Sequence, residues 1–178
     1  MPQPAAGELW IRVAASSINP VDIKIRSGAE RPVLPMPITL GWDLAGHVVD
    51  TGPGVVTTLR PGDYVCLPAD IVTTGPRTVG LTDATGLPLA GLAVLDAVDT
   101  LDLASRSTVL VTGATGAVGG LAVQLLRLRD VTVHAGVRDQ PGRVAAAEAL
   151  GGDHVVAGAV QSGRYYTAED HYLGNRLG

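Results

Sequence analysis

The chain has 178 residues and a formal net charge of −4, a length that suits one large domain or two small ones. It contains no basic stripe and no long apolar run, so neither nucleic acid nor a membrane is expected as a partner, and we predict a soluble cytoplasmic protein. The single cysteine, Cys66, excludes an internal disulfide framework and a four-cysteine zinc site.

The first half of the chain has the pattern of short strands separated by turns. Apolar residues alternate with other residues over 8–17, which predicts a strand, and residues 20–28 suggest one short helical turn that Gly28 closes. Three prolines make residues 31–39 an extended loop. Further strands, with glycine- and proline-rich turns between them, are predicted over residues 41–49, 55–60 and 64–67. This punctuation indicates an antiparallel, barrel-like β unit.

A helical pattern over residues 87–98 precedes the most informative stretch, Thr108 to Gly120. A short apolar strand pattern there is followed by a glycine turn and by a helix, one face of which carries Val118, Leu121, Ala122, Leu125 and Leu128. This order predicts a dinucleotide-phosphate site, because glycine lets a pyrophosphate come close and the helix start offers free N–H groups to the anion. The predicted cofactor contacts in this stretch are Gly113, Gly116, Val118 and Gly119.

A second strand is predicted over residues 132–137 and is followed by Arg138 and Asp139. An acidic residue at this place usually binds the ribose hydroxyls of NAD, whereas a basic one accommodates the extra phosphate of NADP. Because Arg138 comes first, we predict NADPH, with Arg138 as a cofactor contact. The alternative is an ordinary βαβ unit in which glycine serves only tight packing.

The end of the chain contains one more helix and one more strand. Residues 144–150 are alanine-rich and helical, with Pro141 in the first turn behind Asp139 as cap, and residues 154–157 form a third strand candidate. The polar tail, residues 159–178, follows no pattern. The expected domains are a barrel part at 1–85, a helix and linker at 86–107, a nucleotide-binding part at 108–158 and the tail.

Several of these motifs, taken in order, resemble the medium-chain dehydrogenase/reductase family, in its zinc-free quinone oxidoreductase and enoyl reductase branch. The matching pieces cover most of residues 8–157 and lie at residues 17–28, 41–49, 61–65, 87–92, 109–119 and 150–156. The resemblance implies the fold class α/β plus β: a partial GroES-like β-barrel followed by a shortened Rossmann-type parallel sheet with helices.

The resemblance also implies a function and a site. It implies NADPH in the cleft between the two parts and hydride transfer to a conjugated enone or quinone. Asn19 and Asp22 are the implied substrate contacts, although Asn19 also suits a turn cap and Asp22 a helix-start carboxylate. Asn19 and Trp42 occupy the positions of the cysteine and histidine ligands of the family's zinc enzymes, so no metal is expected.

Departures from the family pattern limit what the resemblance implies. The chain begins at what is normally the barrel's third strand, a segment between Cys66 and Leu67 is missing, and the second half of the Rossmann sheet after Val156 is absent. The form therefore resembles a truncated enzyme. Such a half sheet has an open edge, which the tail, a partner chain in a homodimer or a changed topology must cover.

Two functions of different classes follow. The first is NADPH-dependent reduction of an enone or quinone, for which no catalytic acid or base is evident. The alternative is a cofactor-independent cyclase, which could catalyse a cycloaddition by holding a hydrophobic substrate in an apolar cleft rimmed by Trp10, Trp42 and Tyr64. Trp42 and Tyr64 are the predicted substrate contacts of that cleft, and a nonenzymatic binding module is a third possibility.

Overall fold

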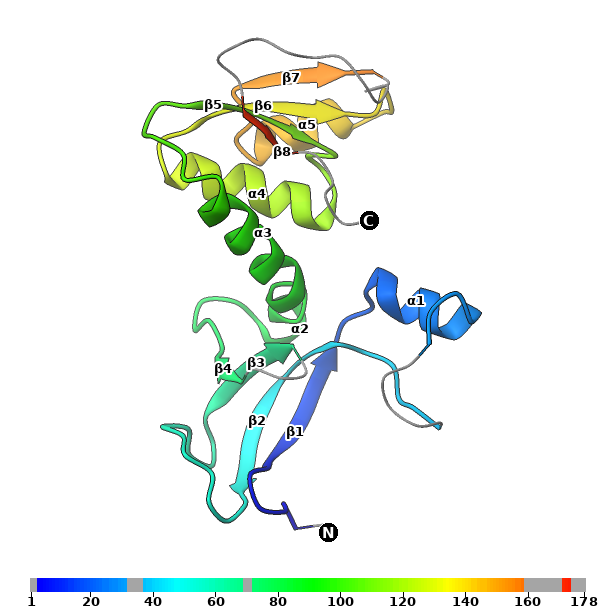
Figure 1. Cartoon of the computed structure of the whole chain (residues 1–178), viewed down its shortest axis with the longest axis vertical. Coiled ribbons are helices and arrows are strands. Elements are labelled where there is room, and N and C mark those ends of the chain that lie inside the picture. The colour runs from blue at the N-terminus through cyan, green and yellow to red at the C-terminus, as the bar shows by residue number, and fades with distance from the viewer. Residues whose placement is uncertain (1–2, 32–36, 69–71, 159–170, 174–178) are drawn as a thin grey trace. The chain divides into compact units, whose positions relative to one another are not determined.

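The computed structural model describes residues 3–31, 37–68, 72–158 and 171–173 (Figure 1). The chain divides into two compact units, residues 1–89 and residues 90–178. Each unit is described by itself. No helix of the described residues is both long enough and apolar enough to cross a membrane.

Unit 1 is built on a four-stranded sheet in the order β1-β2-β3-β4 (Figure 1). All neighbouring pairs are antiparallel. The elements of the unit are β1 Leu9–Ser16, α1 Pro20–Ser27, β2 Asp43–Thr51, β3 Tyr64–Pro68, β4 Thr73–Thr74 and α2 Leu81–Ala84. The sheet and its helices agree with the predicted antiparallel β unit.

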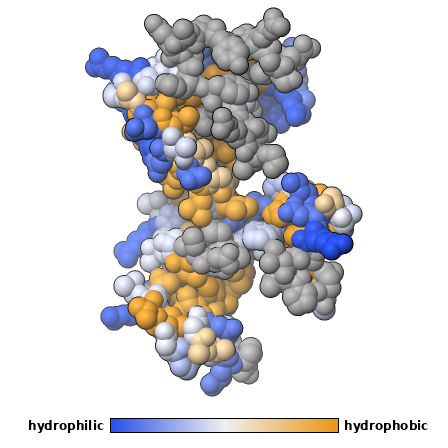
Figure 2. Space-filling view, in the orientation of Figure 1, coloured by the Kyte–Doolittle hydropathy of each residue, from blue (hydrophilic) through white to orange (hydrophobic). Residues whose placement is uncertain are grey.

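Side chains alternate between the two faces of β2 and β3, and this gives unit 1 two small hydrophobic cores. Val48 and Val65 lie in one cluster with Leu59, whereas Ala45 and Cys66 lie in another with Ala84 of α2. Successive side chains of a strand point to opposite faces, so the two clusters lie on opposite faces of the sheet. Apolar residues gather over this unit on the face that Figure 2 shows.

The predicted strand over residues 55–60 is wrong. That segment is a loop, in which Val56 is exposed and Leu59 is buried in the core. The hydrogen bonds of β2 explain the difference, because Val48 donates to the carbonyl of Asp63 at 2.9 Å and accepts from the N–H of Gly62 at 2.8 Å. The edge of β2 that a strand at 55–60 would need is therefore taken by the chain that leads into β3.

Unit 2 is a parallel sheet in the order β7-β6-β5-β8, with helices packed on it (Figure 1). Its elements are α3 Pro88–Thr100, which begins in the last residues of unit 1, β5 Thr108–Thr112, α4 Ala117–Leu128, β6 Thr132–Val137, α5 Arg143–Ala149, β7 His154–Ala157 and β8 His171–Leu173. The core lies between one face of the sheet and these helices, where Val109 and Val133 pack with Val123, Leu126 and Ala147.

The tail contributes a strand to this sheet. Residues 171–173 form β8, which pairs in parallel with residues 109–111 of β5. In the order of a Rossmann sheet, this is the position beside the first strand where the fourth strand lies. Of the three predicted ways to cover the open edge of β5, the structure therefore shows the tail.

Two predictions about the helices of unit 2 are wrong in detail. Of the residues predicted for one face of α4, Ala122 is buried and Leu121 and Leu125 pack against the core, whereas Val118 and Leu128 are exposed. The core also takes Val123 and Leu126, which the prediction left out. Helix α5 begins at Arg143 after a left-handed Gly142, so neither Asp139 nor Pro141 occupies the predicted cap or first-turn position.

Candidate functional site

The glycine turn of unit 2 has the shape that its sequence predicts. Gly113 has φ +66°, a left-handed conformation that favours glycine, and its carbonyl accepts from the N–H of Gly116 at 2.8 Å. A Cβ built on Gly119 would lie 2.2 Å from the Gly113 carbonyl oxygen. Gly119 therefore lets the first turn of α4 lie directly against the loop that follows β5.

The start of α4 offers hydrogen-bond donors. Gly116 precedes the helix in an extended conformation, and no side chain caps it within the described part of the chain. The first N–H groups of a helix have no partner inside the helix, so they and the positive end of the helix dipole can bind an anion. The predicted contacts Gly113, Gly116, Val118 and Gly119 lie together at this turn.

A second arginine lies beside the turn. Nη1 of Arg143, the first residue of α5, donates to the Thr115 hydroxyl at 2.8 Å and approaches the Thr115 carbonyl at 3.4 Å. The predicted Arg138 is exposed at the end of β6. The sequence interpretation missed Arg143. A cation in the first turn of a helix is unfavourable, so an arginine at the start of α5 could have indicated a binding role.

In unit 1, the Asp43 carboxylate holds together the end of β1, the start of α1 and the start of α3. Its side chain is 2% exposed, and its carboxylate accepts from Ser17 Oγ at 2.8 Å, Asn19 Nδ2 at 2.9 Å and the N–H of Leu89 at 3.0 Å. These donors come from the end of β1, from the residue before α1 and from the start of α3. Sequence reasoning missed this carboxylate, which ties together three segments that are distant in the chain.

The predicted substrate contacts Asn19 and Asp22 take part in the same network. Asn19 Nδ2 donates both to Ser17 Oγ and to Asp43, and the Asp22 carboxylate accepts from the N–H groups of Asn19 and Gly41, each at 2.8 Å. Asp22 is 4% exposed. Both residues hold the fold at the start of α1, and their role toward a substrate stays a prediction.

The aromatic residues of the predicted cleft lie apart in unit 1. Trp42 immediately precedes β2, whereas Trp10 pairs with Asp50 near the other end of that strand. Tyr64 pairs with His47, four residues along β2 from Asp43. Unit 1 by itself therefore does not bring Trp10 and Trp42 to one rim, because Asp50 lies seven residues along the strand from Asp43, roughly 23 Å of extended chain.

Tyr64 and Cys66 are side chains with altered acidity. Burial raises the pKa of the Cys66 thiol, and the negative charge of Asp43 raises it further. Burial also raises the pKa of Tyr64, and the Tyr64 hydroxyl, which is shielded from solvent, has no hydrogen-bond partner among the described residues. A protonated thiol is a poor nucleophile, so Cys66 suits a packing role rather than covalent chemistry.

The chemistry of the described side chains gives no metal site. Across residues 3–31, 37–68, 72–158 and 171–173, no group of three or more histidine, cysteine, aspartate or glutamate side chains comes together. His134 and His154 face each other on neighbouring strands, with ring centroids 4.7 Å apart, but a third ligand does not accompany them there.

Comparison with known proteins agrees with this architecture. Residues 5–99 match the family model of the alcohol dehydrogenase GroES-like domain. Among curated proteins, a chloroplast envelope quinone oxidoreductase homolog of Arabidopsis thaliana is 34% identical over 182 residues, which cover 88% of this chain and 54% of that protein. The chain spans about half the length of the curated relatives it matches.

Solved structures give the same result. A mycobacterial quinone oxidoreductase superposes with a TM-score of 0.78 at 28% identity, covering 88% of this chain and 52% of that one. A mycobacterial protein complexed with NADPH superposes with a TM-score of 0.76 at 28% identity and the same coverage of both chains. The predicted fold class, a partial GroES-like barrel followed by a shortened Rossmann-type sheet, is confirmed.

Proposed function

Because the chain belongs to the medium-chain dehydrogenase/reductase family, in its quinone oxidoreductase branch, we propose that it reduces a conjugated enone or a quinone with NADPH. The family supports an oxidoreductase that uses a nicotinamide cofactor. The proposal adds to this the choice of NADPH over NADH and the enone or quinone as the acceptor. The observation that carries it is the uncapped start of α4 beside Arg143.

The residues of unit 2 fit a dinucleotide phosphate. Gly119 lets the first turn of α4 lie against the loop that follows β5, and no side chain caps this helix start within the described residues, so its N–H groups can donate to a pyrophosphate. Arg143 and Arg138 add positive charge near this turn, which suits the extra phosphate of NADPH better than the free ribose of NADH.

The chemistry at the acceptor requires little from this chain. Bound NADPH supplies a hydride, and an enone or quinone that takes this hydride and one proton from water is reduced while NADPH is oxidised. The protein's contribution is to hold the acceptor close and aligned. Asn19 and Asp22 are the proposed contacts, with the Asn19 amide held in orientation by Ser17 and Asp43.

The test is a titration of the purified protein with NADPH and, separately, with NADH, followed by cofactor fluorescence. We expect NADPH to bind more tightly. Arg143→Gln should weaken NADPH about tenfold or more, the loss typical of one charge-assisted hydrogen bond, and should leave NADH nearly unchanged. Arg106→Gln is the matched control, because Arg106 precedes β5 at the end of the strand away from the glycine turn.

A screen of enones and quinones, followed by NADPH absorbance, then tests turnover. Failure of both nucleotides to bind would overturn the reductase proposal, and would favour the cofactor-independent cyclase that the sequence left as an alternative. If Arg143→Gln loses affinity for NADPH and NADH equally, Arg143 does not distinguish the two cofactors.

A further inference from the structure

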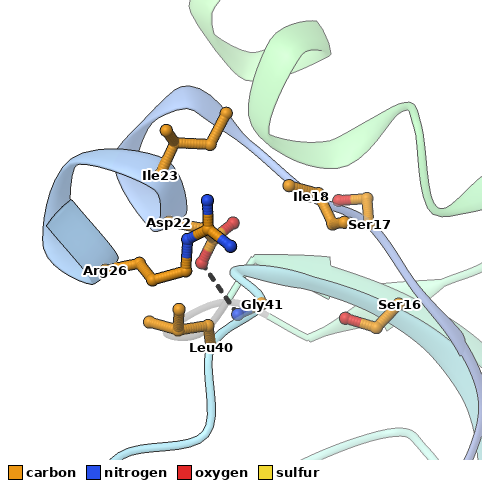
Figure 3. A pocket seen from close by; sticks show the side chains of 8 residues that line it. All are labelled: Ser16, Ser17, Ile18, Asp22, Ile23, Arg26, Leu40 and Gly41. Carbon is orange, nitrogen blue, oxygen red and sulfur yellow. Dashed lines mark hydrogen bonds between the residues drawn. The ribbon is translucent and has the colours of Figure 1, made fainter.

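An open pocket lies beside α1 in unit 1, within the described part of the chain. Its volume is about 520 Å³, which falls in the usual range of small-ligand sites. Figure 3 shows the side chains around it, which come from the end of β1, from α1 and from the approach to β2. The lining residues are Ser16, Ser17, Ile18, Asp22, Ile23, Arg26, Leu40 and Gly41.

The apolar side chains of this pocket are unusually exposed. Ile18 is 83% exposed and Ile23 is 55% exposed, and Leu40 lies across the pocket from Ile23 in Figure 3. Single exposed apolar residues are ordinary, but a cluster of them around a hollow indicates a surface that binds something apolar. A ligand that covered Ile18, Ile23 and Leu40 would remove this surface from water.

Among the described residues that line the pocket, Arg26 alone has a cationic side chain. Its side chain extends from α1 between Ile23 and Leu40 in the view of Figure 3, and no described carboxylate forms an ion pair with it. A guanidinium carries five N–H donors in a planar fork that matches a carboxylate. Arg26 therefore has donors available to a ligand in the pocket.

The other polar groups of the pocket are engaged. The Asp22 carboxylate, which is nearly fully buried, accepts from two backbone N–H groups, and the hydroxyls of Ser16 and Ser17 donate to the carbonyl and the carboxylate of Asp43. The serine hydroxyl protons are thus not available to an anion. An anionic group in this pocket has Arg26 as its partner.

We propose that this pocket binds a small apolar carboxylate, with its hydrocarbon part against Ile18, Ile23 and Leu40 and its carboxylate on the Arg26 guanidinium. The negative charge of Asp22 lies beneath the surface and is held by the N–H groups of Asn19 and Gly41, so the exposed charge at the mouth is that of Arg26. This binding site does not depend on nicotinamide binding.

The experiment uses hexanoate as probe and hexanamide as its uncharged counterpart, with no nucleotide present. Trp42 is adjacent to the lining residue Gly41, and the chain's other tryptophan, Trp10, pairs with Asp50 far along β2. The Trp10→Phe variant therefore leaves one fluorescent reporter beside the pocket. Isothermal titration of the wild-type chain measures the same affinities without a reporter.

We expect hexanoate to bind about tenfold more tightly than hexanamide, as one charge-assisted pair would give. Arg26→Gln should abolish this preference, whereas Lys24→Gln, two residues away on the same helix, should leave it unchanged. Lys24 already faces Glu30 at 4.0 Å and does not line the pocket. Ile23→Ser should weaken both probes, and Val56→Ser, at an exposed site outside the pocket, should weaken neither.

Three results would overturn the proposal: equal affinity for the two probes, an unchanged preference in Arg26→Gln, or no saturable binding up to about 10 mM. Circular dichroism of each variant separates loss of binding from loss of folding. Because the assay contains no nucleotide, its outcome is independent of whether the protein is an NADPH-dependent reductase.

Discussion

Replacing Asp43 by alanine is the sharpest test of how unit 1 is held together. The substitution removes the acceptor shared by Ser17 Oγ, Asn19 Nδ2 and the N–H of Leu89. The Ser17 hydroxyl can rotate to another acceptor, but the other two donors are fixed by the backbone or by a second hydrogen bond. A partly buried donor without a partner costs about 1–3 kcal/mol, so we expect unit 1 to lose about 3 kcal/mol of unfolding free energy.

The assay is urea denaturation followed by tryptophan fluorescence. Both tryptophans, Trp10 and Trp42, lie in residues 1–89, so the signal reports unit 1 alone. With a denaturant slope of about 1–2 kcal/mol per M, a loss of 3 kcal/mol lowers the midpoint by about 1.5–3 M. Hydrogen exchange at the Leu89 amide should quicken in the same variant, because that N–H loses its acceptor.

Asp50→Ala is the matched control on the same strand. Asp50 is exposed, and its carboxylate accepts only from the N–H of the next residue, Thr51, among the described residues. We expect that variant to change stability by less than about 0.5 kcal/mol. If Asp43→Ala and Asp50→Ala unfold at the same urea concentration, the buried carboxylate does not hold these segments together, and the reasoning is refuted.

Three further predictions concern single side chains. Gly119→Ala should destabilise unit 2 by about 1–3 kcal/mol, because the new Cβ meets the Gly113 carbonyl. Gly91→Ala in α3, where a Cβ meets nothing within 4 Å, should instead stabilise the unit by up to about 1 kcal/mol. Thermal melts followed by circular dichroism measure both variants, and equal effects would contradict the packing reason. Tyr64→Phe should leave the urea midpoint unchanged or raise it, because the buried hydroxyl has no hydrogen-bond partner among the described residues, and a clear fall would contradict this reason. The raised pKa of Cys66 means that the folded state keeps a proton that the unfolded chain loses, so this stabilisation is complete below pH 9.0 and is lost as the pH rises through the higher folded pKa. Cys66→Ala should therefore make the fall of the urea midpoint at alkaline pH less steep. An unchanged slope would assign that fall to Tyr64, whose pKa is also raised.

The parts of the fold that sequence predicts well are those set by neighbours in the chain. Gly28 ends α1 with φ +77°, and the glycine turn before α4 forms as expected, because a left-handed residue or a close approach leaves glycine as the favoured choice. The strand predicted over residues 55–60 is wrong because its place in the sheet depends on other segments of the chain and not on its own residues. Its composition permits a strand, but the edge of β2 that it would need is occupied by residues 62–64.

The two candidate regions differ in the same way. The glycine turn of unit 2 lies in a short stretch, from the strand before Gly113 to Arg143, where local pattern and spacing carry most of the information. The network of unit 1 depends on Asp43, whose partners Ser17, Asn19 and Leu89 stand 24 to 46 residues away in the chain. No local pattern encodes such distances, so a sequence can assign Asn19 to the site without revealing that its amide is already bonded to a buried carboxylate. The relative roles of Asn19 and Asp43 thus become visible only when the network is seen whole: if Asn19 contacts a substrate, as we propose, the Asp43 carboxylate orients its amide for that contact.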